Sequence, residues 1–384
     1  MTNDNLSLSL RELSVYRELL SLPVTECALR LVRAAETHDR EAGAEARAEL
    51  FYLLRSCGHR SLGSWLAEAL RRSESPYPLL AERGLRDEAL EEAARRDIAL
   101  LEQLALTDWA AALELPALPC LTAEAPFSFS SLTDSYLKEG ASQVGLYRAF
   151  VWEDGALIPV EHPDAPSARE LLGYDREREQ VIANTRALLE GRGVNNVLLY
   201  GESGTGKSAT VKHLLTLPGM EELRIIEADK ENLAGLPALI RSLEGRRQKF
   251  IVFIDDLTFD RDDPTYAVLK TILEGGVERR PDNVAVYATS NRRHLVRQTI
   301  SEREGDEMDR NETIREKTSL ADRFGIRILF RGLRKEEYLA VVELLAHRRG
   351  IDLPREELHS RAIAWERLHG AQTPRTALQF VLTL

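Results

Sequence analysis

A glycine-rich segment between two apolar runs constrains the fold of this chain more than any other feature. It follows the run NNVLLY, precedes the run ATVKHLL, and consists of Gly201, Glu202, Ser203, Gly204, Thr205, Gly206, Lys207 and Ser208. These residues match the phosphate-loop pattern GxxxxGK[ST], which is specific when a strand comes before it and a helix after it. The sequence therefore predicts a strand, a tight loop and a helix in this order.

The residue types of this loop suit it to bind phosphate groups. Gly201, Gly204 and Gly206 allow backbone N–H groups to turn inward without steric clashes, and the helix that follows presents its positive end to an anion. We expect Lys207 to contact the outer phosphates of a nucleotide and the Ser208 hydroxyl to bind Mg²⁺. A chance match is disfavoured, because both the preceding strand and the following amphipathic helix are present.

Beyond the loop, strand-like and helix-like segments alternate along the chain. The segments are RIIEAD, LPALIRSLEG, KFIVFIDD, TYAVLKTILEG and VAVYATS. Their apolar runs do not alternate with polar residues, as is typical of strands that are covered on both faces. The sequence therefore predicts an α/β fold, with a parallel sheet and helices on each side.

Carboxylate and amide residues end two of these apolar runs. Asp255 and Asp256 close the run KFIVFIDD, and Asn291 follows VAVYATS. We expect Asp255 to hold Mg²⁺ through water molecules, and Asp256 to orient or deprotonate the water that attacks the γ-phosphate. Asn291 contacts the same phosphate if the two strands are neighbours; otherwise it caps the turn that follows it.

The composition changes along the chain and divides it into four regions. Residues 1–120 are rich in Ala, Leu, Glu and Arg with helical periodicity, which predicts an all-α domain of about five or six short helices. A linker at 121–167 contains a small β element, because Asp154-Gly155 is a common hairpin turn signal. We assign residues 168–331 to the α/β core and 332–384 to a helical lid.

Charge and hydropathy argue against several classes of protein. The 384 residues include no long apolar run and begin without a secretory signal, so we expect a cytoplasmic protein with no membrane partner. The 62 acidic and 51 basic residues give a net charge of -11, which argues against a surface that binds nucleic acid throughout. Cys27, Cys57 and Cys120 fit neither a disulfide framework nor a metal site, and we interpret them as small core residues.

The order of these motifs resembles the AAA+ class of ATPases. A phosphate loop, an Asp-Asp strand, an Asn-ended strand, the arginine of SLADRFG and a helical C-terminal piece follow one another as in that class. The segments FIDDLTF, LKTILEGG, YATSNRRHL and SLADRFG resemble, more narrowly, a bacterial AAA+ family described as a domain of unknown function. The resemblance extends over residues 168–384 and implies a P-loop NTPase core with a lid, ATP and Mg²⁺ as ligands, and ATP hydrolysis.

The resemblance also implies roles for single residues. Asn291 corresponds to the residue that senses the γ-phosphate, and Arg323 to an arginine finger that completes the site of a neighbouring subunit, which requires a homo-oligomer. Arg375 corresponds to the lid arginine that contacts the phosphates, and Gly173 and Tyr174 to residues that approach the base. The alternatives are a helix cap for Arg323 and a surface position near a helix N-terminus for Arg375.

Asp256 departs from the pattern of many AAA+ enzymes, which carry Glu at this position. Its side chain is one methylene shorter, so fast turnover and slow hydrolysis in a nucleotide-gated assembly switch both stay open. A P-loop kinase for small molecules would have no use for Asn291 and Arg323.

The partner of such an ATPase is the least constrained feature. One hypothesis is an ATPase that remodels or loads a protein recruited by the N-terminal helices; another is a DNA-associated ATPase of the initiator or helicase-loader type. The interval EADKENLAGLPALIRSLEGRRQ has no aromatic residue for a pore loop, which disfavours threading of a protein chain. Arg279-Arg280 and Arg292-Arg293 are candidates to bind DNA phosphates, but no aromatic residues interleave them. We interpret the charged segment 301–317 as a solvated helix or loop.

Overall fold

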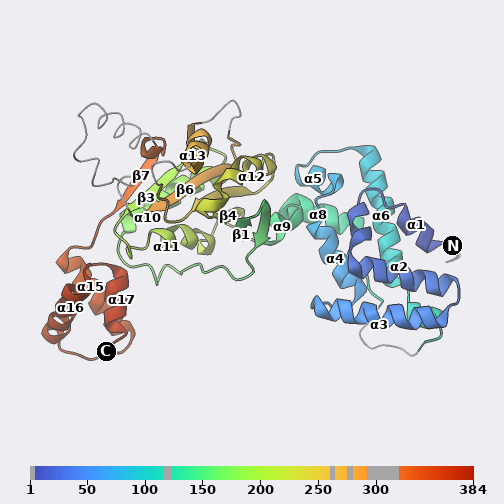
Figure 1. Ribbon diagram of the computed structural model, residues 1–384, viewed down its shortest axis with the longest axis horizontal. Helices are drawn as coiled ribbons and strands as arrows, with labels where there is room; N and C mark the ends of the chain where they lie inside the picture. The colour runs from blue at the N-terminus through green and yellow to red at the C-terminus, as the bar shows by residue number, and fades with distance from the viewer. Residues whose placement is uncertain (1–4, 116–122, 260–263, 275–279, 292–319) are drawn as a thin grey trace. The chain divides into compact units, whose positions relative to one another are not determined.

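The computed structural model of the protein describes residues 5–115, 123–259, 264–274, 280–291 and 320–384. The chain forms two compact units, Met1–Leu146 and Tyr147–Leu384 (Figure 1). The boundary falls inside the segment 121–167 that we assigned to a linker, so the two ends of that segment belong to different units. Within the described ranges, no helix is both long and apolar enough to span a membrane.

The first unit is helical. Its α-helices are α1 (Leu6–Arg11), α2 (Pro23–Glu36), α3 (Arg40–Ser56), α4 (Leu62–Arg72), α5 (Pro76–Glu82), α6 (Glu88–Leu106), α7 (Trp109–Ala112), α8 (Phe129–Glu139) and α9 (Ser142–Leu146), with a 3-10 helix at Arg17–Ser21. The prediction of five or six helices before residue 120 is too low, because α1 to α7 all lie there. α1 and α7 have 6 and 4 residues, too few to show a helical period in the sequence.

A buried carboxylate orders the start of this unit. Asp97 of α6 is 1% exposed, and its Oδ2 atom accepts the backbone N–H groups of Ser14 (2.9 Å), Val15 (2.7 Å) and Tyr16 (3.2 Å). Buried polar groups are tolerated only when they are hydrogen-bonded, so the carboxylate and the chain that enters the 3-10 helix satisfy each other. The apolar faces of the surrounding helices close a continuous core around this contact.

The second unit is built on a seven-stranded sheet. Its strands are β1 (Ala149–Glu153), β2 (Ala156–Pro159), β3 (Val197–Gly201), β4 (Leu223–Ala228), β5 (Lys249–Ile254), β6 (Val284–Ser290) and β7 (Ile326–Phe330). They lie in the order β2-β1-β4-β5-β6-β3-β7, and all neighbours are parallel except β1 and β2; the labels β1, β4, β6, β3 and β7 follow one another across the sheet in Figure 1. Because β3, β5 and β6 are parallel, the residues that follow them meet at the carboxyl end of the sheet. The predicted α/β fold is confirmed.

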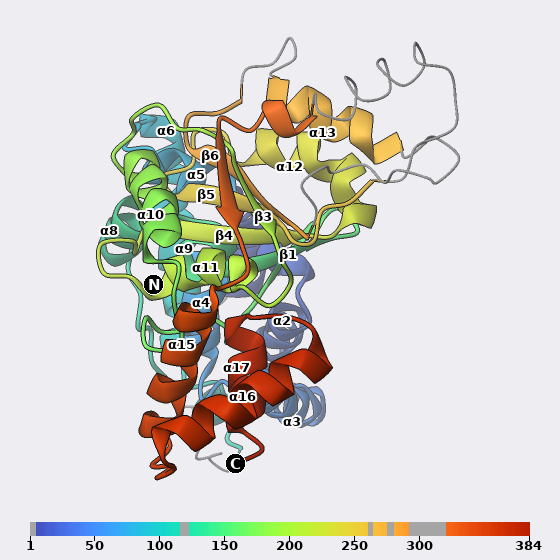
Figure 2. The same cartoon turned by 90° about the vertical axis from the view of Figure 1, so that its left-hand side faces the viewer.

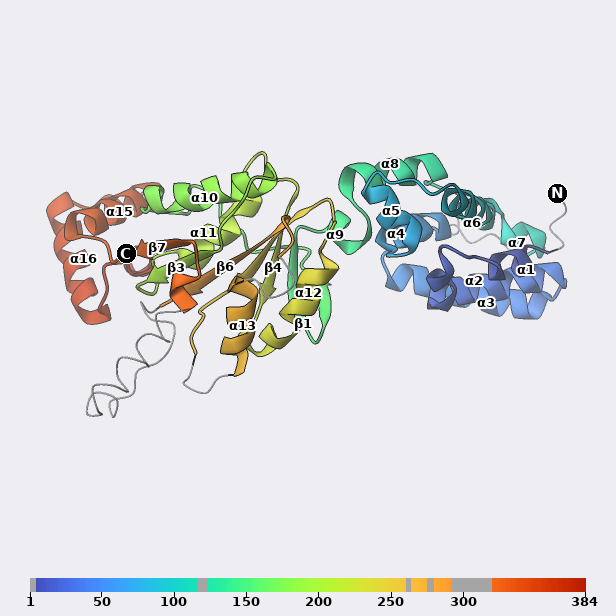
Figure 3. The same ribbon diagram turned by 90° about the horizontal axis from the view of Figure 1, so that it is seen from above.

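Helices cover both faces of this sheet. α10 (Asp175–Leu189) and α11 (Lys207–His213) lie on one face, and α12 (Leu236–Ser242) and α13 (Pro264–Glu274) lie on the other (Figure 3). Short 3-10 helices occupy Leu214–Thr216 and Lys230–Gly235. On the first face, Val181 and Val211 pack with Val197 and Leu199 of β3. The strand before the phosphate loop and the helix after it therefore share one apolar core.

The predicted hairpin forms, but it is part of the sheet and not of a linker. Asp154 and Gly155 have φ angles of 49° and 79°, and β1 pairs with β2 directly across them. Positive φ at both central residues is the signature of the two-residue turn that Asp-Gly favours. β1 also pairs in parallel with β4, so the hairpin extends the sheet at its edge.

The C-terminal helices form a small bundle beyond β7. They are α15 (Lys335–Arg348), α16 (Arg355–His369) and α17 (Pro374–Val381), which lie together at the lower side of the unit in Figure 2. Tyr338, Val342 and Phe380 are buried between them. The Leu333 N–H donates to the Gln372 carbonyl (2.8 Å), which ties the segment after β7 to the residues that precede α17. We refer to these helices as the lid.

Candidate nucleotide site

The phosphate loop connects the end of β3 to the start of α11 and depends on its glycines. Gly201, Gly204 and Gly206 have φ angles of 135°, 79° and 90°, which L side chains rarely adopt. A Cβ atom at Gly201 would lie 2.0 Å from the carbonyl oxygen of Phe330 in β7. The Thr205 hydroxyl donates to the Glu202 carbonyl (2.8 Å) and closes the turn. The exposed Glu202 and Ser203 complete the loop.

Lys207 points into this loop. The residue is almost completely buried, and its ammonium group donates to the carbonyls of Gly201 (3.1 Å) and Glu202 (2.7 Å) and to Oδ1 of Asn291 (2.9 Å). Burial lowers the pKa of Lys207, while the nearby charges of Asp256 and Asp255 act in the opposite direction. A bound anion would give Lys207 charged acceptors in place of neutral ones. Hydrogen bonds to a charged acceptor are stronger than hydrogen bonds to a neutral one.

The two carboxylates after β5 lie beside the loop. Ser208 Oγ donates to Asp255 Oδ1 (2.6 Å), and Asn291 Nδ2 donates to Asp256 Oδ1 (2.8 Å). Asn291 also accepts from Lys207, and the Asp256 N–H donates to Asp255 Oδ1 (3.1 Å), so the predicted phosphate, metal and water-activating residues form one connected network. The hydroxyl of Ser208 and the carboxylate of Asp255 are oxygen donors of the type that Mg²⁺ prefers. This pair therefore fits a Mg²⁺ ion that is shared with a bound phosphate.

Two further residues of this network are absent from the sequence-based prediction. The Thr289 hydroxyl donates to Asp255 Oδ1 and accepts the backbone N–H of Asp256 (2.9 Å), and Ser290 Oγ donates to the Leu257 carbonyl (2.9 Å). Thr289 precedes Asn291 by two residues, and residues two apart on a strand share a face. That spacing was a usable signal, but a threonine inside an apolar run first indicates a strand-forming residue.

The lid reaches the loop through the start of α17. The Arg375 N–H donates to the Gly204 carbonyl (3.3 Å), and a Cβ atom at Gly204 would lie 3.0 Å from both Arg375 Cβ and Thr373 Oγ1. The Arg375 charge also contributes to the lowered pKa of Lys207. The structure thus places Arg375 beside the phosphate loop, and its role toward phosphates stays a prediction.

Gly173 and Tyr174 lie at the junction of the core and the lid. Both have left-handed φ angles, 69° and 59°, directly before α10. The Tyr174 hydroxyl donates to the Arg331 carbonyl (2.6 Å), and its ring centroid lies 5.1 Å from that of Phe330. Burial raises the pKa of the Tyr174 phenol, which stays a neutral donor. This turn therefore packs on the segment that links β7 to the lid.

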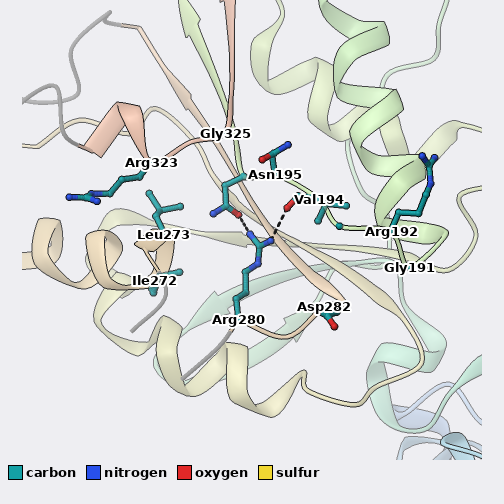
Figure 4. Close-up of a pocket in the computed structure, with 12 residues that line it drawn as sticks. Gly191, Arg192, Val194, Asn195, Ile272, Leu273, Arg280, Asp282, Arg323 and Gly325 are labelled. Atoms are coloured by element: carbon teal, nitrogen blue, oxygen red, sulfur yellow. Dashed lines mark hydrogen bonds between the residues drawn. The ribbon is translucent and has the colours of Figure 1, made fainter. Parts of the chain in front are cut away.

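Arg323 lies away from these residues. It precedes β7, whose Ile326 N–H donates to the Asn196 carbonyl immediately before β3, so Arg323 is beside the start of β3. It lines a cavity of about 560 Å³ together with Asn195, Leu273 and Arg280. Figure 4 shows the Arg323 side chain extending away from Arg280. The phosphate loop follows the opposite end of β3, so the structure does not bring Arg323 to the other predicted site residues.

The predicted DNA-binding arginines are only partly described. Arg280 donates to the Val194 carbonyl (3.0 Å) and to Asn196 Oδ1, and burial lowers its pKa (Figure 4). Its guanidinium group is thus directed into the protein. Arg279, Arg292, Arg293 and the segment 301–317 lie outside the described residues.

The fold and the arrangement of this site define the class of protein: an α/β P-loop NTPase with an AAA+ module, preceded by a helical unit. The family model described as "Protein of unknown function (DUF815)" matches residues 145–384, and the chain belongs to this family. A comparison with curated proteins finds no match.

Solved structures with a similar fold include RuvB from Thermotoga maritima, described as a Holliday junction branch migration motor. That chain is 17% identical, with a TM-score of 0.37; the match covers 56% of this chain and 63% of that chain. Two mutants of the same protein are 17% and 16% identical, each with a TM-score of 0.39. They are matched over 56% and 57% of this chain and over 63% and 64% of their own length. The chain thus spans less than two thirds of each of these structures.

Proposed function

We propose that the protein binds MgATP between the phosphate loop and the lid and hydrolyses it. The observation that carries this proposal is the network of hydrogen bonds that joins Lys207, Asn291 and Asp256 and, beside it, Ser208 and Asp255. These groups follow two parallel strands, β5 and β6, or begin the helix α11, and they meet at the end of the sheet where the loop glycines leave room for phosphates.

Each residue has a role that its chemistry supports. Lys207 would exchange its bond to Asn291 for the outer phosphate oxygens, and Arg375 would approach the same oxygens from the lid. Ser208 and Asp255 would hold Mg²⁺, which neutralises charge on the phosphates when it is bound. Asp256 would accept a proton from the attacking water, and Asn291 would orient the γ-phosphate.

Slow turnover is part of this proposal. Asp256 has a left-handed backbone, with φ of 48°, and its carboxylate is engaged by the Asn291 amide. A shorter side chain that is already hydrogen-bonded must shift before it can contact water. These observations favour a nucleotide-gated switch with slow hydrolysis over rapid cycling.

We propose that a second copy of the chain supplies Arg323. β3 has 5 residues and separates Arg323 from the phosphate loop of its own chain by about 16 Å at 3.3 Å per residue. An arginine on the opposite side of the core is suited to the site of a neighbouring subunit, where its charge would stabilise the transition state. We further propose that unit 1 recruits a protein partner. A DNA partner is less favoured, because Arg280 is engaged inside the core.

ATP hydrolysis by the purified full chain tests the central proposal. We expect Mg²⁺-dependent phosphate release that is lost in Lys207→Ala. Asp256→Asn should bind ATP but lower kcat by about a hundredfold or more, as is typical when a general base is removed. A wild-type protein that neither binds nor hydrolyses ATP would contradict the proposal, and full activity in Asp256→Asn would exclude its catalytic role.

A mixing experiment tests the role of Arg323. Arg323→Ala keeps the phosphate loop but lacks the arginine finger, and Lys207→Ala keeps the finger but lacks the lysine of the loop. Each variant alone should therefore be inactive. In a one-to-one mixture with random assembly, roughly one interface in four joins the two intact parts, and about a quarter of the wild-type activity should return. Mixtures without any recovery would refute a finger supplied by another subunit.

The partner hypothesis needs a separate test. The Asp256→Asn variant loaded with ATP should retain a protein that the wild type releases, and a chain lacking residues 1–146 should retain none. DNA that stimulates hydrolysis at low salt would instead favour the loader hypothesis.

A further inference from the structure

We propose that Thr289 is the positioning residue for both carboxylates of the site: its hydroxyl fixes Asp255 toward Mg²⁺ and Asp256 toward the attacking water. The inference rests on the proposed function and assigns a residue that contacts neither metal nor nucleotide.

The hydroxyl of Thr289 lies between the two aspartates. It donates its single proton to Asp255 Oδ1, and it accepts the backbone N–H of Asp256 at 2.9 Å. Thr289 is 1% exposed, so water does not compete for these bonds. Because the hydroxyl has only one proton, it can donate to one carboxylate and must accept from the Asp256 N–H, so one side chain contacts both residues.

β6 also fixes the backbone of the turn that carries Asp256. Left-handed φ is costly for residues other than glycine and persists only where the surroundings enforce it. Here the Leu257 N–H donates to the Thr289 carbonyl (2.7 Å) and Ser290 Oγ donates to the Leu257 carbonyl (2.9 Å). Together with the Thr289 hydroxyl, these bonds hold both sides of Asp256.

The role of Thr289 becomes larger when the metal site is filled. Ser208 Oγ also donates to Asp255 Oδ1 (2.6 Å), but a serine hydroxyl that binds Mg²⁺ turns its oxygen toward the metal. The Thr289 hydroxyl would then be the side chain that holds Oδ1, together with the Asp256 N–H (3.1 Å), and would leave Oδ2 available to the metal or its water. Residues that orient metal ligands in this way commonly change metal affinity or activity by 10- to 100-fold when they are replaced, about the same range as we expect here.

Thr289→Val tests the inference, since valine keeps the shape of threonine and removes the hydroxyl. We expect the Mg²⁺ concentration for half-maximal binding of a fluorescent, non-hydrolysable ATP analogue to rise about tenfold, and kcat to fall about tenfold. Binding of the analogue in EDTA should stay within about twofold of wild type, because the phosphate loop is unchanged. Thr289→Ser should behave like wild type, since it restores the hydroxyl.

Thr185→Val is the matched control. Thr185 is fully buried in α10, and its hydroxyl contacts the Val181 carbonyl (2.8 Å) and the Tyr287 hydroxyl (2.9 Å) but neither aspartate. The Thr185→Val variant should lower the melting temperature as Thr289→Val does, but it should leave the Mg²⁺ requirement for binding unchanged. An unchanged Mg²⁺ requirement in Thr289→Val, or an equal increase in Thr185→Val, would overturn the inference. If the wild type binds the analogue but does not hydrolyse ATP, hydrolysis is refuted while the Mg²⁺ titration still decides the role of Thr289.

Discussion

Substituting Gly201 by alanine should destabilise the second unit far more than the same change elsewhere in the phosphate loop. The new Cβ atom would lie 2.0 Å from the Phe330 carbonyl oxygen and 2.7 Å from its carbon, both backbone atoms that cannot rotate away. The φ angle of 135° adds about 1–3 kcal/mol for a residue other than glycine. Moving β7 aside adds about 1–3 kcal/mol of overpacking, and losing the Glu202 N–H bond to Phe330 adds about 1 kcal/mol.

The sum is a loss of about 5 kcal/mol, roughly the whole stability of a small domain. Gly206→Ala is the matched control, because Gly206 has φ of 90° but nothing within 4 Å of its Cβ position, so only the backbone strain of about 1–2 kcal/mol applies. Urea-induced unfolding in nucleotide-free buffer compares the two variants without a contribution from bound ligand. Equal free energies of unfolding for the two variants would refute the steric argument.

Three further predictions concern other parts of the chain. Iodoacetamide at pH 8 should modify the exposed Cys57 but not Cys27, because burial raises the pKa of the Cys27 thiol to about 11; peptide mass spectrometry reads the outcome. Asp97→Ala should lower the stability of unit 1 by about 2–4 kcal/mol, since backbone N–H groups lose their acceptor, and thermal denaturation measures this. Arg375→Ala should weaken ATP binding about tenfold with an unchanged melting temperature, measured by calorimetry, because its backbone bond to Gly204 remains.

The cysteines show where composition misleads. We interpreted all of them as core residues, which is right for Cys27 and wrong for Cys57, since Cys57 is exposed just after α3. Cys120 lies outside the described residues. A residue type sets an average burial, whereas the burial of one residue depends on which face of its helix meets a neighbour.

Local patterns predicted the sheet, but not which strands lie at its edge. Apolar runs, glycines and the Asp154-Gly155 turn are readable because each depends on a few adjacent residues. The place of the hairpin depends on β1 pairing with β4, where Ala149 lies opposite Ile225. No local feature encodes a contact between segments so far apart in the chain, and the hairpin therefore resembled a linker.

The sequence predicted which residues lie together at the ends of the parallel strands. It did not predict the hydrogen bonds that orient their side chains. Parallel strands explain why Asp256 and Asn291 come together, and this followed from the alternation of strands and helices. The contact of Thr289 with both aspartates depends on the left-handed backbone conformation of Asp256. No residue type in this segment predicts that conformation. Residues that orient others are thus the part of a site that sequence motifs omit.

The resting contacts define what a nucleotide must displace. Asn291 accepts from Lys207 and donates to Asp256, so one amide connects the phosphate-binding cation to the proposed base. Under the proposed function, phosphates that take over Lys207 would leave the Asn291 oxygen without this donor, and the amide could turn toward the γ-phosphate. Asp256 would then lose the Asn291 donor and could accept from water. Nucleotide binding and activation of the proposed base would thus be coupled through the Asn291 side chain.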